Sequence, residues 1–277
     1  MGKLDYHNLW RGFIMGTTEV VPGVSSGTIA VVIGIYEQLI ASINGLSTRK
    51  WKQSILFLAP LVIGIFIAVF SIANLIDFLF EHYTAQLFYL FLGLILGVLP
   101  FLVKRVRVKQ TFTSKHYAIL ALSFAIIIAF GLWQGVHSEE AESLLPSITT
   151  GDYVAIFFAG WVASSAMLLP GISGSFILLI TGYYRTIIDA LSNLHFPVLI
   201  TLIAGIGVGV LITSKIVHFF LQRFPVGTYA VVIGMVAGSG IIIFPGIPLD
   251  FAAAFTSIVA FFVGIIIALL LGRVEHK

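Results

Sequence analysis

Long apolar runs account for most of the sequence. Six of them are long enough, or nearly so, to cross a bilayer as helices, since a helical span needs about 20 mostly apolar residues. They are residues 53–80, 87–103, 117–134, 197–221, 227–244 and 251–272. The chain is therefore predicted to be an all-α integral membrane protein.

Two further apolar regions, 10–46 and 153–192, are interrupted by the runs PGVSSGT at 22–28 and PGISGSF at 170–176. Proline kinks a helix, glycine loosens it and serine competes for backbone hydrogen bonds, so each run should separate two helical arms. The first arm, residues 10–21, would be about 18 Å long, whereas the hydrocarbon core is about 30 Å thick. We therefore expect each region to form a re-entrant helical hairpin.

The chain also repeats itself. A shift of 148 residues superimposes the two Pro-Gly runs and places Gly34 on Gly182, and a shift of 141 residues aligns the spans that follow. The first predicted repeat is 1–134 and the second is 151–277, with an acidic extracytoplasmic loop at 135–150 between them. Each repeat would contain one hairpin and three spans. An odd number of crossings gives the repeats opposite orientations, as in inverted-repeat transporters.

The distribution of basic residues favours this topology. In the inverted arrangement, 13 of the 15 Lys and Arg residues fall on one side, which the positive-inside rule identifies as the cytoplasm. They are Lys3, Arg11, Arg49, Lys50, Lys52, Lys104, Arg105, Arg107, Lys109, Lys115, Arg223, Arg273 and Lys277. Both termini are then cytoplasmic, the first hairpin enters from the cytoplasm and the second enters from outside. The alternative, parallel repeats in which each hairpin is one broken span, would place Lys3 and Arg11 outside.

Composition narrows the class of protein. Hydrophobic residues make up 59% of the 277 residues and charged residues 10%, against about 25% charged residues in soluble domains. This balance excludes a soluble enzyme, a nucleic-acid-binding protein and a disordered chain. The chain has no cysteine, which excludes disulfides and thiolate chemistry. Its seven histidines lack metal-ligand spacing, so neither a metal nor a cofactor is expected.

The two Pro-Gly runs are the candidate substrate site. Each run begins a new helical arm, whose unpaired N–H groups and positive dipole end favour an anion. Glycines let a headgroup approach the backbone, and hydroxyl groups add donors. The candidate phosphate-binding residues are Gly23, Ser25, Ser26, Gly27, Thr28, Gly171, Ser173, Gly174 and Ser175. The alternative is that proline and glycine only break the helices while serine caps them.

Three charged residues in the hairpins could also act on the substrate. Glu19 lies within an apolar stretch, where ionisable groups are costly and often functional. It could carry a proton, bind a cation, pair with a base or cap a helix. Arg185 lies where the first repeat has Glu37, and its planar guanidinium suits phosphate oxygens, although it could instead pair with Glu19 or Glu37 or extend to the interface. We predict coupling roles for Glu19 and Glu37 and a phosphate contact for Arg185.

Three pairs of glycines within the predicted spans are separated by three residues. They are Gly93 with Gly97, Gly205 with Gly209, and Gly234 with Gly238. Such spacing lets two helix backbones approach closely. These pairs are predicted to be helix contacts, not ligand sites.

The two Pro-Gly motifs resemble those of a known family. The run EVVPGVSSGT at 19–28, followed by Gly34-Ile35-Tyr36, and the run MLLPGISGSFILL at 167–179 are similar to the two signatures of the bacterial polyprenyl-phosphate transporters (PopT). The similarity covers nearly the whole chain. It implies a flippase, not an enzyme, that returns undecaprenyl phosphate to the cytoplasmic leaflet of the bacterial plasma membrane for synthesis of peptidoglycan and other wall polymers. The two repeats themselves suggest transport by alternating access, in which a proton or another cation could take part. The protein could also form a homo-oligomer.

Two other functions remain alternatives. Similar loops on inverted repeats occur in membrane undecaprenyl-diphosphate phosphatases, which typically carry a His shortly after the Ser-Ser of the first loop and an Arg within the second. Here Ser26 is followed by Gly27, and Ser173 is followed by Gly174, so the acid–base and charge-stabilising groups of a phosphatase are missing from those positions. The third alternative is a secondary transporter of a small soluble anion.

Overall fold

A computed structural model describes residues 6–19, 25–137, 149–172, 174, 177–178 and 181–275. Within these ranges the chain forms helices and no strand, which confirms the all-α prediction for the described residues. In chain order the helices are α1 (His7–Glu19), α2 (Ser26–Val32), α3 (Tyr36–Leu46), α4 (Trp51–Arg105), α5 (Val108–Thr111), α6 (Ser114–His137), α7 (Thr150–Leu168), α9 (Tyr184–Ser192), α10 (Phe196–Arg223), α11 (Pro225–Ile242) and α12 (Phe251–Glu275).

Among the described residues, seven helical segments are long and apolar enough to cross a membrane. They are Trp51–Ser71, His82–Arg105, Ser114–Trp133, Thr150–Leu168, Phe196–Arg223, Pro225–Ile242 and Phe251–Leu270. Each of the six predicted spans overlaps one of these segments, and the chain is a multi-pass membrane protein. The additional segment is α7, which is long enough to cross by itself, so the re-entrant course of the second hairpin stays a prediction.

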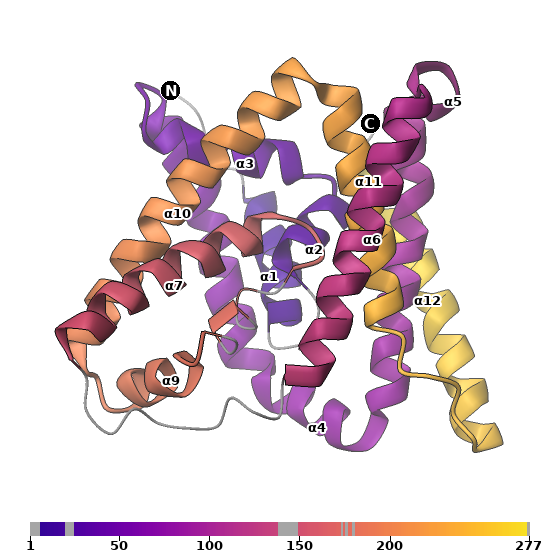
Figure 1. Ribbon diagram of the computed structural model, residues 1–277. Helices are drawn as coiled ribbons and strands as arrows, with labels where there is room; N and C mark the ends of the chain where they lie inside the picture. The colour runs from indigo at the N-terminus through magenta and orange to yellow at the C-terminus, as the bar shows by residue number, and fades with distance from the viewer. Residues whose placement is uncertain are drawn as a thin grey trace.

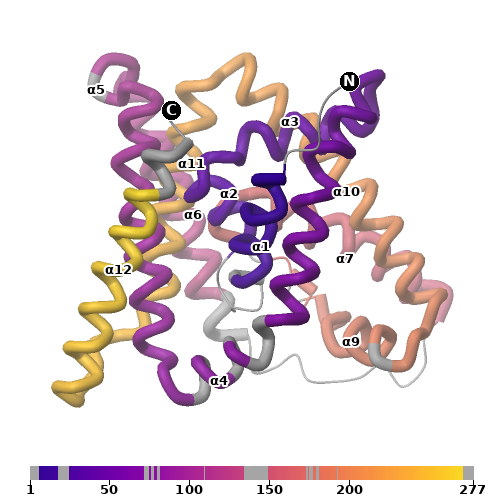
Figure 2. The backbone as a smooth tube through the Cα atoms, turned by 180° about the vertical axis from the view of Figure 1, so that it is seen from behind, coloured from indigo at the N-terminus to yellow at the C-terminus, as the bar shows by residue number. Residues whose placement is uncertain are grey.

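The first two predicted spans belong to a single helical element. α4 continues for 55 residues, and its backbone leaves helical geometry at Tyr83, where φ is −136° and ψ is 35°. Figure 2 shows α4 running down one side of the molecule, crossing its lower end and running up the other side, so that its two halves are antiparallel with α1 and α2 between them. Residues 81–86 contain neither proline nor glycine, so no helix-breaking residue marks the kink in the sequence.

The first Pro-Gly region forms three helices where two arms were predicted. α1 has 13 residues and is about 20 Å long, which is too short to cross about 30 Å of hydrocarbon. α2 and α3 are separated at Gly34, whose φ of +77° lies in the left-handed region that glycine adopts without strain. Gly182, the residue that the 148-residue shift aligns with Gly34, also has a φ of +77°. The two hairpin regions therefore turn at matching glycines.

Helices pair closely across the molecule. α1 packs against the first half of α4 and α7 against α10, while α12 packs against the second half of α4 and α6 against α11. A backbone carbonyl of the partner helix lies against Gly93, Gly205 and Gly234, where a side chain would not fit. The prediction that the spaced glycine pairs make close helix contacts is confirmed.

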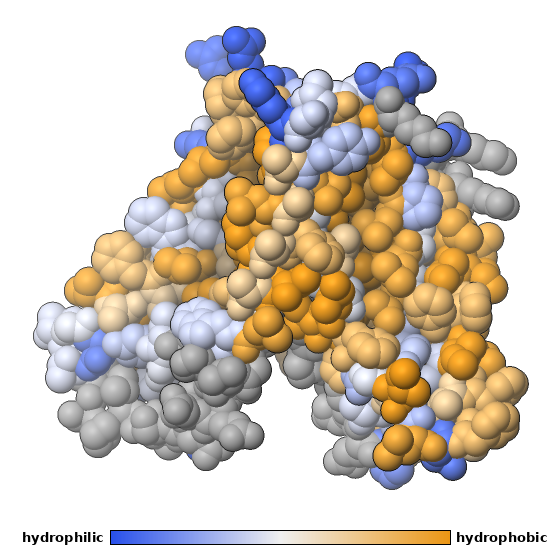
Figure 3. All heavy atoms as spheres, turned by 45° about the vertical axis from the view of Figure 1, so that its right-hand side comes forward, coloured by the Kyte–Doolittle hydropathy of each residue, from blue (hydrophilic) through white to orange (hydrophobic). Residues whose placement is uncertain are grey.

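α2 lies at the centre of the molecule (Figure 1), and its residues from Gly27 to Val32 are all buried. The outer faces of the long helices, in contrast, expose large apolar side chains such as Phe70, Ile203 and Phe262. Figure 3 shows an apolar surface across the middle of the molecule, with hydrophilic residues gathered at the upper end. Soluble monomers rarely expose such continuous apolar surface, so lipid is its expected environment.

The helix ends divide into two groups. The α3–α4 junction, α5 and the α10–α11 turn lie at one end of the molecule, and α9 and the α11–α12 connection lie at the other (Figure 1). We call the first the basic end, because its segments carry basic residues, among them Arg49, Lys50, Lys104, Arg107 and Arg223. This grouping agrees with the predicted segregation of charge. That the basic end faces the cytoplasm stays a prediction.

Candidate functional site

The first Pro-Gly run leads into α2 through a capped helix start. Ser25 is the N-cap residue, and its hydroxyl oxygen accepts a hydrogen bond from the backbone N–H of Gly27 at 3.2 Å. The same hydroxyl lies 3.5 Å from the carbonyl oxygen of Met167, to which it donates. Ser25 is thus a helix cap, as the alternative interpretation of this run predicted. It is also a link to the second Pro-Gly run.

Two further hydrogen bonds join what we call the two Pro-Gly segments, which are the first run with α2 and Tyr36, and the end of α7 from Met167 with the second run. The hydroxyl oxygen of Thr28 accepts from the backbone N–H of Gly171 at 2.8 Å. The hydroxyl of Tyr36 donates to the carbonyl oxygen of Leu168 at 3.0 Å. Burial raises the pKa of the Tyr36 phenol, which keeps the hydroxyl protonated as a donor. Segments that are more than 130 residues apart in the sequence therefore meet at the molecular centre.

Two glycines make this approach possible. A Cβ atom at Gly27 would lie 2.7 Å from the carbonyl oxygen of Met167, closer than real Cβ contacts allow. Gly171 has a φ of +87°, and a Cβ atom there would lie 3.0 Å from the carbonyl oxygen of Met235 in α11. Gly174 is buried as well, against the side chain of Met167. These glycines are needed for close packing of the segments, in addition to the ligand role predicted for them.

The polar groups at this contact are occupied in the present conformation. Thr28 is 1% exposed and Ser25 is 5% exposed, and their hydroxyl groups bond to the backbone of α7, of the second Pro-Gly run or of α2. Ser26 is partly buried beside them. A phosphate could bind to these donors only after the two segments separate. The contact between the two segments is therefore closed in this conformation.

Some predicted site residues lie outside what the structure describes. Gly23, Ser173 and Ser175 are outside the described residues. Glu19 is described only as the last residue of α1, without its side chain. The roles predicted for these four residues stay predictions.

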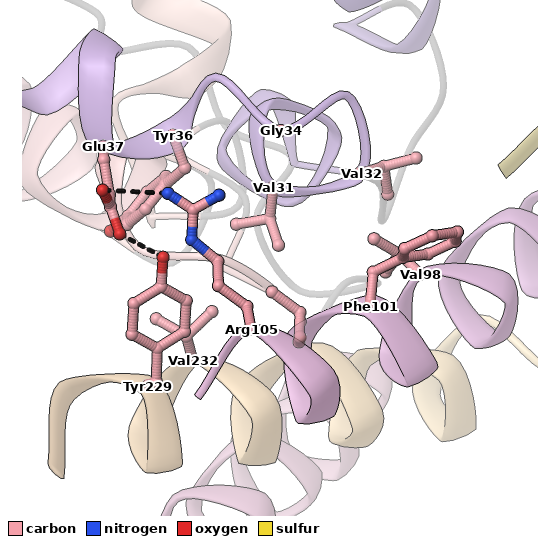
Figure 4. A pocket seen from close by; sticks show the side chains of 11 residues that line it. Val31, Val32, Gly34, Tyr36, Glu37, Val98, Phe101, Arg105, Tyr229 and Val232 are labelled. Atoms are coloured by element: carbon pink, nitrogen blue, oxygen red, sulfur yellow. Dashed lines mark hydrogen bonds and ion pairs between the residues drawn. The ribbon is translucent and has the colours of Figure 1, made fainter. Parts of the chain in front are cut away.

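Glu37 belongs to a second polar site, at the basic end (Figure 4). One carboxylate oxygen of Glu37 accepts from the Arg105 guanidinium at 3.1 Å, and the other accepts a hydrogen bond from the Tyr229 hydroxyl. The Arg105 guanidinium also lies 6.0 Å from the centre of the Tyr229 ring. These three residues, which we call the Glu37 cluster, tie together α3, the end of α4 and the start of α11.

The sequence did not identify two members of the Glu37 cluster. Arg105 was counted only among the basic residues that fix the topology, and Tyr229 was not singled out. The partners are 68 and 192 residues from Glu37 along the chain. No local motif signals such a contact. Its position two residues after a predicted apolar span is the only clue that the sequence offers for Arg105.

Arg185 lies far from Glu37. It is the second residue of α9 and its side chain is exposed. α9 and α3 lie at opposite ends of the molecule in both ribbon views (Figures 1 and 2). The suggestion that Arg185 pairs with Glu37 is therefore wrong, because Arg105 takes that place. Its predicted contact with a phosphate stays a prediction.

Two cavities flank Tyr36 and Val232. The smaller, of about 40 Å³, lies beneath the Glu37 cluster and is lined by Val31, Val32, Gly34, Tyr36, Glu37, Val98, Phe101, Leu102, Arg105, Tyr229 and Val232. The larger, of about 760 Å³, is an apolar groove between α6, α10 and α11. In the described parts of the chain, no three His, Asp or Glu side chains come together in a way that could hold a metal ion.

Comparison with known proteins identifies relatives. A family described as undecaprenyl phosphate translocase-like matches residues 15–254. A polyprenyl-phosphate transporter of Staphylococcus aureus is 41% identical over 100% of this chain and 99% of its own length. A polyprenyl-phosphate transporter of Vibrio cholerae is 32% identical over 83% of this chain and 74% of its own length. No solved structure matches the chain. The protein belongs to the undecaprenyl phosphate translocase-like family.

Proposed function

We propose that the chain is a flippase that moves polyprenyl phosphate, with undecaprenyl phosphate as the expected form, from the outer to the cytoplasmic leaflet of the bacterial plasma membrane. Two relatives named as polyprenyl-phosphate transporters, one similar over its full length, support this substrate. The observation that carries the proposal is the contact between the two Pro-Gly segments, from Thr28 to Gly171. The returned lipid would serve again as a carrier in wall-polymer synthesis.

The chemistry of the substrate fits a central polar site in an apolar protein. Its chain is at home in lipid, but its phosphate would lose hydration at a large cost in the hydrocarbon core. Backbone N–H groups and hydroxyl groups of the paired segments would replace that hydration once the Thr28–Gly171 contact opens. Arg185, at the end opposite the basic end, would contact the phosphate as it enters from the outer leaflet.

Helix pairing supports an inverted repeat. Two pairs form within the predicted repeats, α1 with the first half of α4 and α7 with α10. Two pairs form between them, the second half of α4 with α12 and α11 with α6. A two-fold relation between the repeats would exchange the two pairs within the repeats, and likewise the two pairs between them, so the pairing fits the predicted internal repeat. Movement of one repeat against the other would then open the central site alternately to each leaflet.

Glu37 and Glu19 are the proposed coupling residues. Protonation of Glu37 would remove the charge that holds Arg105 and would weaken the tie between α3, α4 and α11. The basic end would then open, and the phosphate would leave to the cytoplasmic leaflet. Glu19 ends α1 three residues before Pro22, where a bound proton or other cation would offset the phosphate charge.

Purified protein reconstituted into vesicles tests this proposal. We expect a labelled polyprenyl phosphate to exchange between leaflets faster than in protein-free vesicles, without release of phosphate from a polyprenyl diphosphate. Phosphate release would favour the phosphatase alternative. Inhibition by soluble anions, but not by lipid phosphates, would favour the small-anion alternative. Unchanged flux after Glu19→Gln combined with Arg185→Ala would contradict those two assignments.

A further inference from the structure

The apolar groove between α6, α10 and α11 has no part in the mechanism above. Its volume of about 760 Å³ falls in the range of ligand sites, about 300–1,000 Å³. α11 contributes Thr228, Val231, Val232 and Met235, which share one helical face because they are spaced by three and four residues. The groove is thus a continuous feature of packed helices, not a gap beneath one loop.

The groove connects the basic end to the central Pro-Gly contact. At the basic end it is lined by His116 near the start of α6 and by Phe224 and Pro225 at the α10–α11 turn. At the other end it reaches Leu169 and Pro170 of the second Pro-Gly segment. Its wall is therefore continuous with the site proposed for the phosphate.

The groove also opens sideways. Ile119 of α6 and Ile216 and Phe220 of α10 line it, and these side chains are 37%, 51% and 46% exposed. They belong to the outer apolar surface that lipid is expected to cover. A lipid chain could enter the groove from the bilayer without crossing a polar layer.

We propose that this groove binds the isoprenoid chain of polyprenyl phosphate, through the isoprene units nearest the phosphate, while the phosphate moves between the Pro-Gly segments and the basic end. The inference rests on the proposed function. A branched apolar chain fits a lining of Val, Ile and Phe side chains. A free soluble anion does not, because an apolar wall offers nothing to replace its hydration. The phosphate alone would therefore be a poor competitor for the groove.

Two exposed isoleucines on the same helix provide a matched test. Ile216→Trp fills the groove, whereas Ile203→Trp changes a residue that is 64% exposed and does not line it. The probe is a polyprenyl phosphate with a photoreactive diazirine in the isoprene unit nearest the phosphate, added to the full chain in vesicles. We expect crosslinks to residues of α6, α10 and α11 that line the groove. Crosslinking and leaflet exchange should each fall about tenfold in Ile216→Trp, which corresponds to ~1.4 kcal/mol.

A second variant in the groove and two competing phosphates complete the test. Val231→Trp should behave like Ile216→Trp, and Ile203→Trp like the unchanged chain. A three-isoprene phosphate should compete with the probe, and inorganic phosphate at the same concentration should not. Crosslinks outside the groove, or exchange by Ile216→Trp as fast as by Ile203→Trp, would overturn the inference while leaving the proposed function intact. Absence of exchange by the unchanged chain would overturn the proposed function and this inference with it.

Discussion

The central Pro-Gly contact and the Glu37 cluster hold the same hairpin in different ways. At the centre, Thr28 is 1% exposed and bonds to a backbone N–H. In the Glu37 cluster, the carboxylate and guanidinium side chains are 42% and 38% exposed. Buried hydrogen bonds are costly to leave unmade, whereas exposed ion pairs contribute little and are screened by salt. The centre therefore specifies how the two segments fit, and the cluster is the part that can open at small cost.

The largest effect is expected from Gly27→Ala. The added Cβ would meet the Met167 carbonyl at 2.7 Å, so the backbone of one segment must move. We expect a loss of about 1–3 kcal/mol in the free energy of unfolding, together with slower lipid exchange. Thermal unfolding in detergent and the vesicle assay measure both. The control is Gly207→Ala in α10, where a Cβ would meet nothing within 4 Å, and equal behaviour of the two variants would refute the tight central contact.

A smaller effect is expected from Thr28→Val, which keeps the shape of the side chain but removes the acceptor for the Gly171 N–H. A buried donor left without an acceptor lowers the free energy of unfolding by about 1–3 kcal/mol. The loss falls in the lower half of that range if the two segments relax around the substituted side chain. Thr201→Val is the control, because that hydroxyl bonds only to a carbonyl within its own exposed helix turn. Unfolding temperatures of the two variants should differ, and identical values would show that the Thr28 hydrogen bond contributes nothing.

A weaker coupling is expected within the Glu37 cluster. A double-mutant cycle of Glu37→Gln and Arg105→Gln should give a coupling of about 0.2–1 kcal/mol, as for other exposed ion pairs. The coupling should shrink when the salt concentration rises from 0.1 to 1 M, since the Debye length falls from about 10 to about 3 Å. A coupling that is larger and independent of salt would mean that the cluster is a rigid part of the fold and not the part that opens.

The smallest effect is expected between Glu37 and Arg185. Because α3 and α9 lie at opposite ends of the molecule, the stability effects of Glu37→Gln and Arg185→Ala should add within about 0.3–0.5 kcal/mol. The same unfolding measurements give this additivity and the coupling between Glu37 and Arg105, so the two values can be compared directly. A clear non-additive term here would contradict the separation of the two ends.

Much of the helical framework followed from local patterns. The apolar runs predicted the spans, because the length of an apolar run is a property of a single helix. The spaced glycines predicted close helix pairs, because small residues act at a single helix contact. Two features of the backbone did not follow from local patterns. The kink at Tyr83 replaced a predicted gap between spans, and the turn at Gly34 split an arm that the sequence treated as continuous, since the handedness of a backbone angle is not visible in composition.

The candidate site was predicted in part. The two Pro-Gly runs were expected to form one site, and the structure places Ser25 and Thr28 of the first run against Met167, at the end of α7, and Gly171 of the second run. Ser25 caps its helix, as the alternative interpretation of this run predicted, and its phosphate-binding role stays a prediction. Arg105 and Tyr229 were missed because they approach Glu37 only when α4 and α11 pack beside α3.

The sequence alone determined that this protein belongs in a membrane and which segments are helical, because each of these depends on the solvation and propensity of neighbouring residues. The tertiary structure decided which polar groups are occupied, which residue neutralises Glu37, and where an apolar groove lies beside the central contact. Those features require side chains from segments far apart in the chain to meet, and only the packing of the whole molecule sets those distances.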